Sequence, residues 1–163
     1  MSANHRILFD RLKALGIAQI TIEHAPMFTV EQSRVFRGQI PGAHTKNLFL
    51  IDKEARMVLV VAKEDTRVDL KALASRLGHG RYSFGKAPLL LTVLGVEAGS
   101  VTPFALINDG ARDVTVVIDK SLMDFAEVNC HPLDNTATTR LKTADLMRFI
   151  RACGHEPMIL PLA

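Results

Sequence analysis

The sequence of 163 residues has few cysteines and no long apolar run, and each shortage excludes a class of protein. Cys130 and Cys153 lie far apart and form no CxxC, which argues against a disulfide framework or a structural zinc site and suits a reducing cytosol. The longest apolar runs, such as 57–62 and 87–94, fall far short of the roughly 18 residues that span a bilayer. The N-terminal segment contains Asp10 and lacks the apolar core of a signal peptide. We therefore expect a cytoplasmic protein that does not involve a membrane.

Several catalytic signatures are also missing from the sequence. There is no GxxxxGK[ST], no GxGxxG after a strand pattern, no HExxH and no GxSxG, which removes the strongest evidence for nucleotide-dependent kinases, Rossmann enzymes, zincins and serine hydrolases. The histidines show no metal-ligand spacing, so we expect no metal and no other cofactor. The net charge is only +3, and any contact with nucleic acid must therefore come from a local patch.

What the sequence does contain predicts one globular domain over residues 1–163, because 48% of the residues are hydrophobic and 23% are charged. Apolar residues at helical spacing, with capping residues and glycine stops, indicate helices over 7–15, 29–36, 69–78 and 143–154. Alternating or short apolar runs indicate strands over 20–22, 46–52, 57–63, 103–107, 114–118, 125–130 and 136–141. The segment 87–94 fits helix or strand, although Pro88 near its start favours a helix.

This order of elements predicts a mixed α/β (α+β) fold, with a curved mixed sheet or small barrel of about seven strands and flanking helices. Most connections between strands are short, so we expect neighbouring strands to be antiparallel. Residues 53–56 are expected to close a hairpin between the strands 46–52 and 57–63.

Three segments place polar residues where a strand would prefer apolar ones. The first, 44–47, brings Lys46 and Asn47 to the start of an apolar strand, where they could hold a phosphate or a carbonyl group. The second, 95–104, is a loop with two glycines whose backbone groups could meet a ligand. Taken alone, Lys46 could be a solvated strand start, and the loop an ordinary connection.

The third segment, 129–139, reads NCHPLDNTATT and joins a strand end, a turn and a polar strand start. Its threonines favour a strand but not a core, so one face of it is expected to line a wet cleft. His131 could be functional or a hydrogen-bonded structural residue. Cys130 is read as a small buried hydrophobe, and it cannot pair with His131 because neighbouring strand residues point to opposite faces.

Taken in this order, the three segments resemble the YbaK/ProRS-associated domain family of aminoacyl-tRNA deacylases, which is related to the editing insertion of bacterial prolyl-tRNA synthetase. The resemblance rests on Lys46-Asn47, on the GxxxP loop from Gly99 to Pro103, and on the segment 129–139, and it covers nearly the whole chain. Within the family, the chain looks most like the freestanding branch that edits proline tRNA charged with alanine, and less like the branch acting on Cys-tRNA.

The resemblance implies hydrolysis of the ester that joins a wrong amino acid to the 3′-terminal adenosine of tRNA. It implies catalytic roles for Lys46, Asn47 and Gly99, with Lys46 holding the acceptor end and Asn47 orienting the substrate or water. The residues implied to border the substrate are Ser100, Pro103, Asn129, His131, Thr138 and Thr139. The implied partners are mischarged proline tRNA and prolyl-tRNA synthetase.

Two alternatives stay open at this point. The same fold could act on tRNA charged with Cys, Ser or Thr, or it could be a non-catalytic module that binds tRNA or a synthetase. Separately, the basic residues Arg76, His79, Arg81 and Lys86 could form a stretch that faces tRNA, or simply a solvated helix end.

Overall fold

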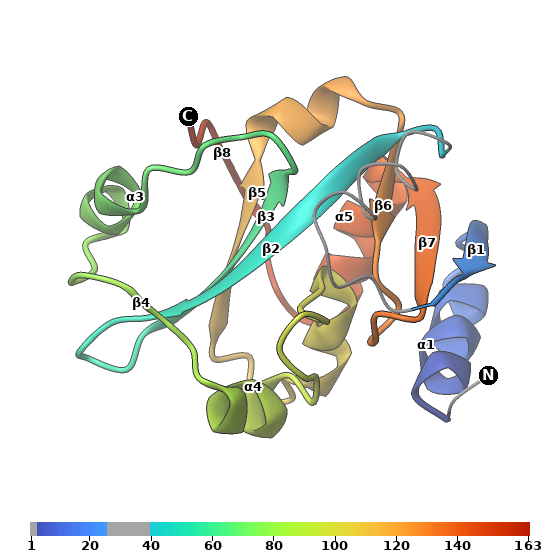
Figure 1. Cartoon of the computed structure of the whole chain (residues 1–163), viewed down its shortest axis with the longest axis horizontal. Coiled ribbons are helices and arrows are strands. Elements are labelled where there is room, and N and C mark those ends of the chain that lie inside the picture. The colour runs from blue at the N-terminus through green and yellow to red at the C-terminus, as the bar shows by residue number, and fades with distance from the viewer. Residues whose placement is uncertain (1–2, 26–39) are drawn as a thin grey trace.

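The computed structural model describes residues 3–25 and 40–163 (Figure 1). The predicted capping box of Thr29 and Gln32, the helix expected through Phe36 and residues 37–39 of the expected loop 37–42 lie outside the described residues. The described helices are α1 Ala3–Ala14, α3 Leu70–Leu77, α4 Ala87–Val93 and α5 Thr143–Ala152, with 3-10 helices η1 Pro103–Asn108 and η2 Lys120–Asp124. The described strands are β1 Gln19–Glu23, β2 Ala43–Ile51, β3 Met57–Lys63, β4 Ser83–Phe84, β5 Val114–Asp119, β6 Glu127–Cys130, β7 Ala137–Lys142 and β8 Met158–Leu160.

The eight strands form one mixed sheet in the order β1-β7-β6-β2-β3-β5-β8, with β4 paired to β2 off this path. The path ends at β1 and β8, so the sheet of the described residues is open and is not a small barrel. The hairpin of β2 and β3 is antiparallel, as predicted, but β2–β6, β3–β5 and β5–β8 are parallel. The expectation of antiparallel neighbours was therefore wrong for these three pairs, because helices and 3-10 turns return the chain between them.

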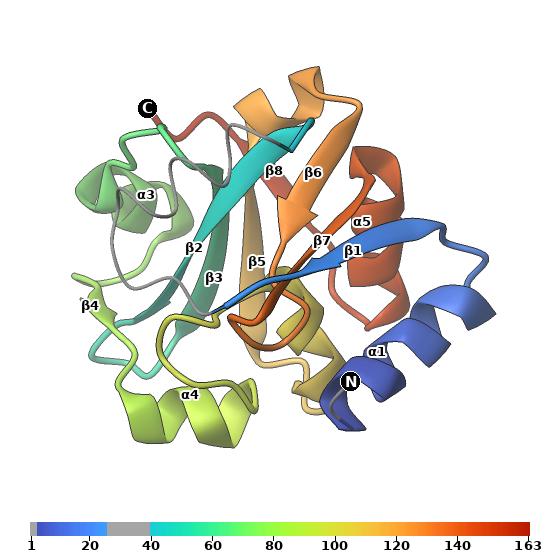
Figure 2. The ribbon, with the colours of Figure 1, turned by 45° about the vertical axis from the view of Figure 1, so that its right-hand side comes forward.

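Two hydrophobic clusters pack against opposite faces of the sheet. The larger contains Leu12 of α1, Leu90 of α4, Phe104 of η1 and Phe149 of α5, and the rings of Phe104 and Phe149 meet edge to face at 5.4 Å. The smaller lies under α3 and the chain after β8. Figure 2 shows α1 and α4 along the lower side of the molecule, and α3 on the opposite side of β2 and β3 from α5. Odd-numbered β2 residues such as Phe49 face the larger cluster, and even-numbered ones such as Leu50 face the smaller.

The helix α3 follows the expected signals. The carboxylate of Asp69 accepts a hydrogen bond from the backbone N–H of Ala72 at 2.9 Å, which caps the helix start, and Gly78 ends the helix. The helix α5 also agrees with the sequence pattern, with Leu146, Phe149 and Ile150 buried.

The secondary structure of two segments became clear only from the structure. Residues 87–93 are a helix, with Pro88 in its first turn as its position favoured. The strand expected over 103–107 was wrong, because these residues form η1. Thr102 caps η1 through a 3.3 Å bond from Phe104 N–H, and Pro103 has the fixed φ that suits a helix start. Among the described residues, the helices are too short or too polar for any of them to cross a bilayer.

Candidate functional site

The predicted site lies where β2 and β6 stop pairing. These parallel strands share only two residue pairs, Ala43 with Val128 and His44 with Asn129. Just beyond them, the hydroxyl of Thr45 donates to the carbonyl oxygen of Asn129 at 2.8 Å. Past this point the backbone ladder between β2 and β6 ends, although β2 continues along β3. The break separates two parts of the sheet that β2 otherwise joins.

Lys46 and His131 border this break together. Besides its bond to Asn129, Thr45 Oγ1 lies 3.5 Å from the sulfur of Cys130, the last residue of β6. Lys46 is the next residue after Thr45, and His131 is the next residue after Cys130. Alternation along the strands places Thr45 and Cys130 on one face and directs Lys46 and His131 to the other. The two residues that the sequence pointed to most strongly therefore share one end and one face of the β2–β6 junction.

Lys46 is a half-buried cation opposite Ala62 of β3. Its ammonium group makes no hydrogen bond and no ion pair with another described residue. Partial burial removes water from an ammonium group, and a nearby anion can compensate that loss. The position of Lys46 therefore suits an anionic or strongly polar ligand group.

His131 presents a neutral imidazole to the same face. Burial lowers the pKa of His131, and the neighbouring His24 adds to this effect, which outweighs the opposing hydrogen bond to Ala137 and the charge of Asp134. The Nδ1 of His131 lies 3.1 Å from the carbonyl oxygen of Ala137. A neutral ring must donate from Nδ1 to this carbonyl, which leaves the lone pair on Nε2. His131 can thus accept a hydrogen bond and fill space, but it brings no positive charge at neutral pH.

Asn129 is buried, and its amide nitrogen is already used. It donates to the carbonyl oxygens of Pro41 at 2.9 Å and Ala43 at 3.2 Å. Gly42 lies between them at a φ of +91°, and a Cβ there would come within 3.0 Å of the Asn129 amide. The side chain therefore fixes the entry of the chain into β2. Its Oδ1 is buried without a hydrogen-bond partner among the described residues.

Asn47 faces the other side of β2 from Lys46, beside Phe49 and opposite Val61. Its Oδ1 is buried and has no hydrogen-bond partner among the described residues. An unpaired buried carbonyl is costly, and a bound donor would remove that cost. Lys46 and Asn47, although adjacent, therefore serve opposite faces of the same strand.

The loop before η1 lies on the Asn47 side. Val96 and Val101 belong to the same hydrophobic cluster as Phe49 and as Leu133 of the β6–β7 turn, and Figures 1 and 2 show this loop beside that turn. Gly99 has a φ of +88°, a conformation that L side chains rarely adopt, and no atom lies within 4 Å of where its Cβ would be. Gly99 thus gives an open stretch of backbone.

Ser100 and Pro103, in the last part of this loop, make contacts that stabilise the local fold. Ser100 is buried and its backbone N–H closes a turn with Glu97 at 3.0 Å. Pro103 is buried at the start of η1. Neither shows a polar side-chain contact among the described residues.

Thr138 and Thr139 point to opposite faces of β7. Thr138 Oγ1 lies 2.9 Å from Nε2 of His24, on the side that its strand position shares with His131, and Thr139 Oγ1 lies 2.8 Å from Oγ1 of Thr21. His24 and Thr21 were not singled out from the sequence. Their only signal was a position within (Thr21) or just after (His24) a short alternating strand, and the pairing of that strand with β7 became visible only in the sheet order.

Cys130 is buried beneath the junction. Burial raises the pKa of its thiol to about 12, which the hydrogen bond from Thr45 only partly opposes. Such a thiol stays protonated at neutral pH and is a poor nucleophile. Within the described part of the chain, no three His, Cys, Asp or Glu side chains gather as a metal site would require.

Comparison with known proteins supplies the family. The model of the aminoacyl-tRNA editing domain matches residues 24–149, a range that contains every candidate site residue. The chain belongs to the aminoacyl-tRNA editing domain family. It is 41% identical over 155 residues to prolyl-tRNA synthetase associated domain-containing protein 1 of Danio rerio, which covers 94% of this chain and 84% of the relative.

A bacterial relative of this editing-domain protein carries a more specific name. The prolyl-tRNA editing protein ProX of Acetoanaerobium sticklandii is 37% identical over 146 residues, or 89% of each chain. A crystal structure of a candidate trans-editing enzyme for prolyl-tRNA synthetase has a TM-score of 0.76, covering 100% of this chain and 99% of that chain. Its identity is 18%, so that likeness shows the shared fold alone.

Proposed function

We propose that the protein hydrolyses the ester of alanine mistakenly attached to proline tRNA, releasing free alanine and intact tRNA. Membership in the editing-domain family and the relative named for prolyl-tRNA editing support this choice. The structural observation that carries it is the half-buried Lys46, unpaired within the described residues and on the same face as His131 at the break between β2 and β6.

The need for such an enzyme follows from simple energetics. A synthetase pocket that accepts proline cannot exclude the smaller alanine, because missing methylene groups are worth only about 1–3 kcal/mol each in binding. A second site that is too small for proline can remove the wrong product. In this proposal His131, held by the carbonyl of Ala137, is a wall of that smaller site.

The reaction needs no protein nucleophile. A water molecule attacks the ester carbonyl carbon, the bond from that carbon to the ribose oxygen breaks, and the proton from water ends on the departing hydroxyl. The main task of the protein is to hold the ester and the water in the reactive geometry. The high pKa of Cys130 agrees with a reaction in which its thiol takes no part.

The roles follow from the contacts. Lys46 holds the negatively charged acceptor end through its free ammonium group. The buried Oδ1 of Asn47 accepts a hydrogen bond from the α-ammonium group or from the attacking water. The open backbone at Gly99 approaches the substrate from the same side as Asn47. Asn129 acts on the site indirectly, because its amide is bonded to the chain entering β2.

Substitution of Lys46 tests the proposed role of its charge. We expect Lys46→Ala to lower the rate of alanine release at least tenfold, which corresponds to about 1.4 kcal/mol of barrier. The matched control is Lys53→Ala, which removes an exposed lysine from the hairpin between β2 and β3. Equal loss in both variants, or unchanged turnover of Lys46→Ala, would remove Lys46 from the mechanism.

A panel of mischarged tRNAs distinguishes the proposed substrate from its alternatives. Faster release of Cys, Ser or Thr than of Ala would assign the same fold to a different substrate. Binding of tRNA without cleavage of any ester would make the protein a non-catalytic module. Recruitment by prolyl-tRNA synthetase and a cytoplasmic location remain predictions.

A further inference from the structure

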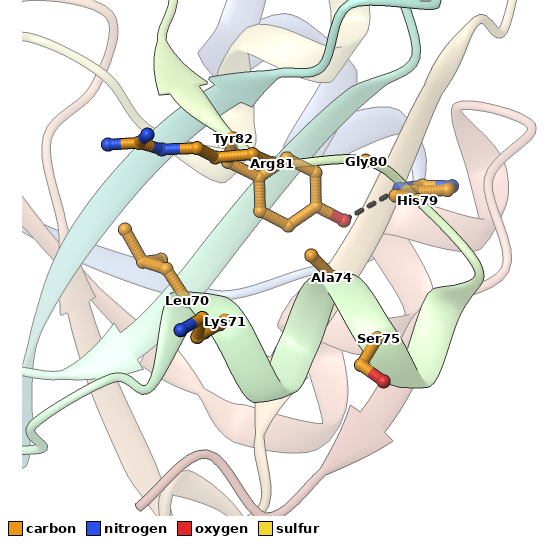
Figure 3. Close-up of a pocket in the computed structure, with 8 residues that line it drawn as sticks. All are labelled: Leu70, Lys71, Ala74, Ser75, His79, Gly80, Arg81 and Tyr82. Carbon is orange, nitrogen blue, oxygen red and sulfur yellow. Dashed lines mark hydrogen bonds between the residues drawn. The ribbon is translucent and has the colours of Figure 1, made fainter.

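A hollow of about 840 Å³ lies away from the β2–β6 junction, between α3 and the chain that follows it. Figure 3 shows Leu70, Lys71, Ala74 and Ser75 of α3 on one wall and Arg81 and Tyr82 on the other. His79 and Gly80 complete the lining. Lys71 and Arg81 are exposed cations, and no carboxylate is among these eight residues.

The second wall is fixed in place. The backbone N–H of Gly80 donates to Oδ2 of the buried Asp52 at 2.9 Å, and the ring nitrogen Nδ1 of His79 lies 2.6 Å from the hydroxyl of Tyr82. Asp52 also accepts from the guanidinium of Arg56 at 2.8 Å, so its negative charge is balanced locally. The backbone of this wall and its aromatic ring are therefore held in a defined position, next in the chain to Arg81.

The net positive charge of the chain is concentrated in the segment that lines this hollow. Residues 65–86 contain five Lys or Arg and two Asp, a net charge of +3, while the remaining residues contain fifteen of each sign. The entire positive excess of the protein is thus carried by the segment that forms α3 and the hollow. One of the two acids, Asp69, is the helix cap and points its oxygen at the backbone of Ala72.

The hollow also shares a face with the proposed catalytic site. Tyr82 and Leu70 pack on the smaller hydrophobic cluster with Leu48 and Leu50, the even-numbered residues of β2 that follow Lys46 on that face. Lys46 and Leu50 are separated by about 13 Å of strand at 3.3 Å per residue. Lys46 and the cations of the hollow therefore lie on the same side of the sheet.

We propose that this hollow binds the phosphodiester backbone of the tRNA substrate close to its acceptor end. The inference rests on the proposed function, since it assigns a second contact to the same RNA. Lys71 and Arg81 neutralise phosphates, and the Tyr82 ring offers an apolar surface to a nucleotide. This contact adds to the binding of whole tRNA and makes no contact with the ester.

The test compares two substrates of the full chain. For Lys71→Gln/Arg81→Gln, we expect the KM for full-length Ala-charged proline tRNA to rise at least tenfold while kcat stays within about twofold. Hydrolysis of a short oligonucleotide ester that carries only the 3′ end should be unchanged. The matched control is Arg6→Gln/Lys13→Gln, which removes two exposed charges from α1, far from α3 in Figure 1.

A second variant and a binding measurement keep the outcome clear. Ser75→Glu places a negative charge on the exposed wall of the hollow and should raise the KM for tRNA in the same way. Affinity for uncharged tRNA should fall in both variants. In the variant that lacks two cations, the slope of log affinity against log salt concentration should become less steep by about 1.5. The binding result stands even if the wild-type protein cleaves no ester, so the two proposals can fail separately.

Two results would overturn the inference. One is a KM and tRNA affinity in the hollow variants equal to those of the α1 control. The other is an equal loss on the short substrate, which would show that the substitutions act on the catalytic site and not on a distant RNA contact.

Discussion

His131 shows how one side chain links folding to the site. Its ring is held by the carbonyl of Ala137, and burial lowers its pKa below the ordinary value of 6.5. The unfolded chain therefore binds a proton at this histidine more readily than the folded protein does. Stability is highest when the ring is neutral in both states, and it falls as the pH drops through 6.5.

We expect the free energy of unfolding of the wild-type protein to decrease between about pH 7.5 and pH 5.5 more steeply than that of His131→Gln. One proton contributes at most about 1.4 kcal/mol per pH unit. Gln keeps a donor for the Ala137 carbonyl but does not titrate. Denaturant unfolding at a series of pH values measures the difference, and parallel profiles for the two proteins would contradict a lowered pKa at His131.

At the scale of elements, a buried pair joins η1, β5 and the end of α5. Oδ2 of Asp109 accepts from the backbone N–H of Val114 at 3.0 Å and lies 2.8 Å from Nε2 of His155. Both side chains are buried. These contacts fix the end of η1. The candidate loop leads into the start of the same element.

Asp109→Ala leaves the Val114 N–H and His155 without this partner, so we expect a loss of about 2–4 kcal/mol of unfolding free energy. Asp109→Asn is the matched variant, because an amide oxygen in the place of Oδ2 can still accept from the Val114 N–H and from an N–H at Nε2 of His155, and it should lose less. Chemical denaturation measures both. Equal losses in the two variants would show that the hydrogen bonds at this position are not what stabilises the junction.

The helices and the central hairpin could be predicted from the sequence because their signals are local. Asp69 and Gly78 bound α3 by capping, and the apolar spacing in 143–154 defines α5. The segment 103–107 was mistaken for a strand because its apolar run fits either structure, and burial on all sides hides the helical period. The strands β4 and β8 are too short to show an alternation.

The candidate residues could also be found locally, but their arrangement could not. Nothing in the spacing of Lys46 and Asn47 from His131 shows that β2 and β6 are parallel and separate after two residue pairs. The use of Asn129 as a brace for the chain at Gly42, and the pairing of His24 with Thr138, depend on contacts between distant segments. Sequence patterns give the residue types of the site, whereas the sheet order decides which of them share a face.

For the whole molecule, the two proposals divide the work between the ends of β2. The junction with β6 holds Lys46 and His131, and the α3 face carries the positive excess of the chain. In these proposals, the amino acid is selected at one end of β2 and the RNA backbone is bound at the other. Selectivity for the amino acid then belongs to the junction alone.

The most direct test is the release of amino acid from proline tRNA charged with alanine or with proline, measured side by side with the purified wild-type protein. We predict rapid loss of alanine and retention of proline. Equal hydrolysis of the two esters, or none of either, would contradict it.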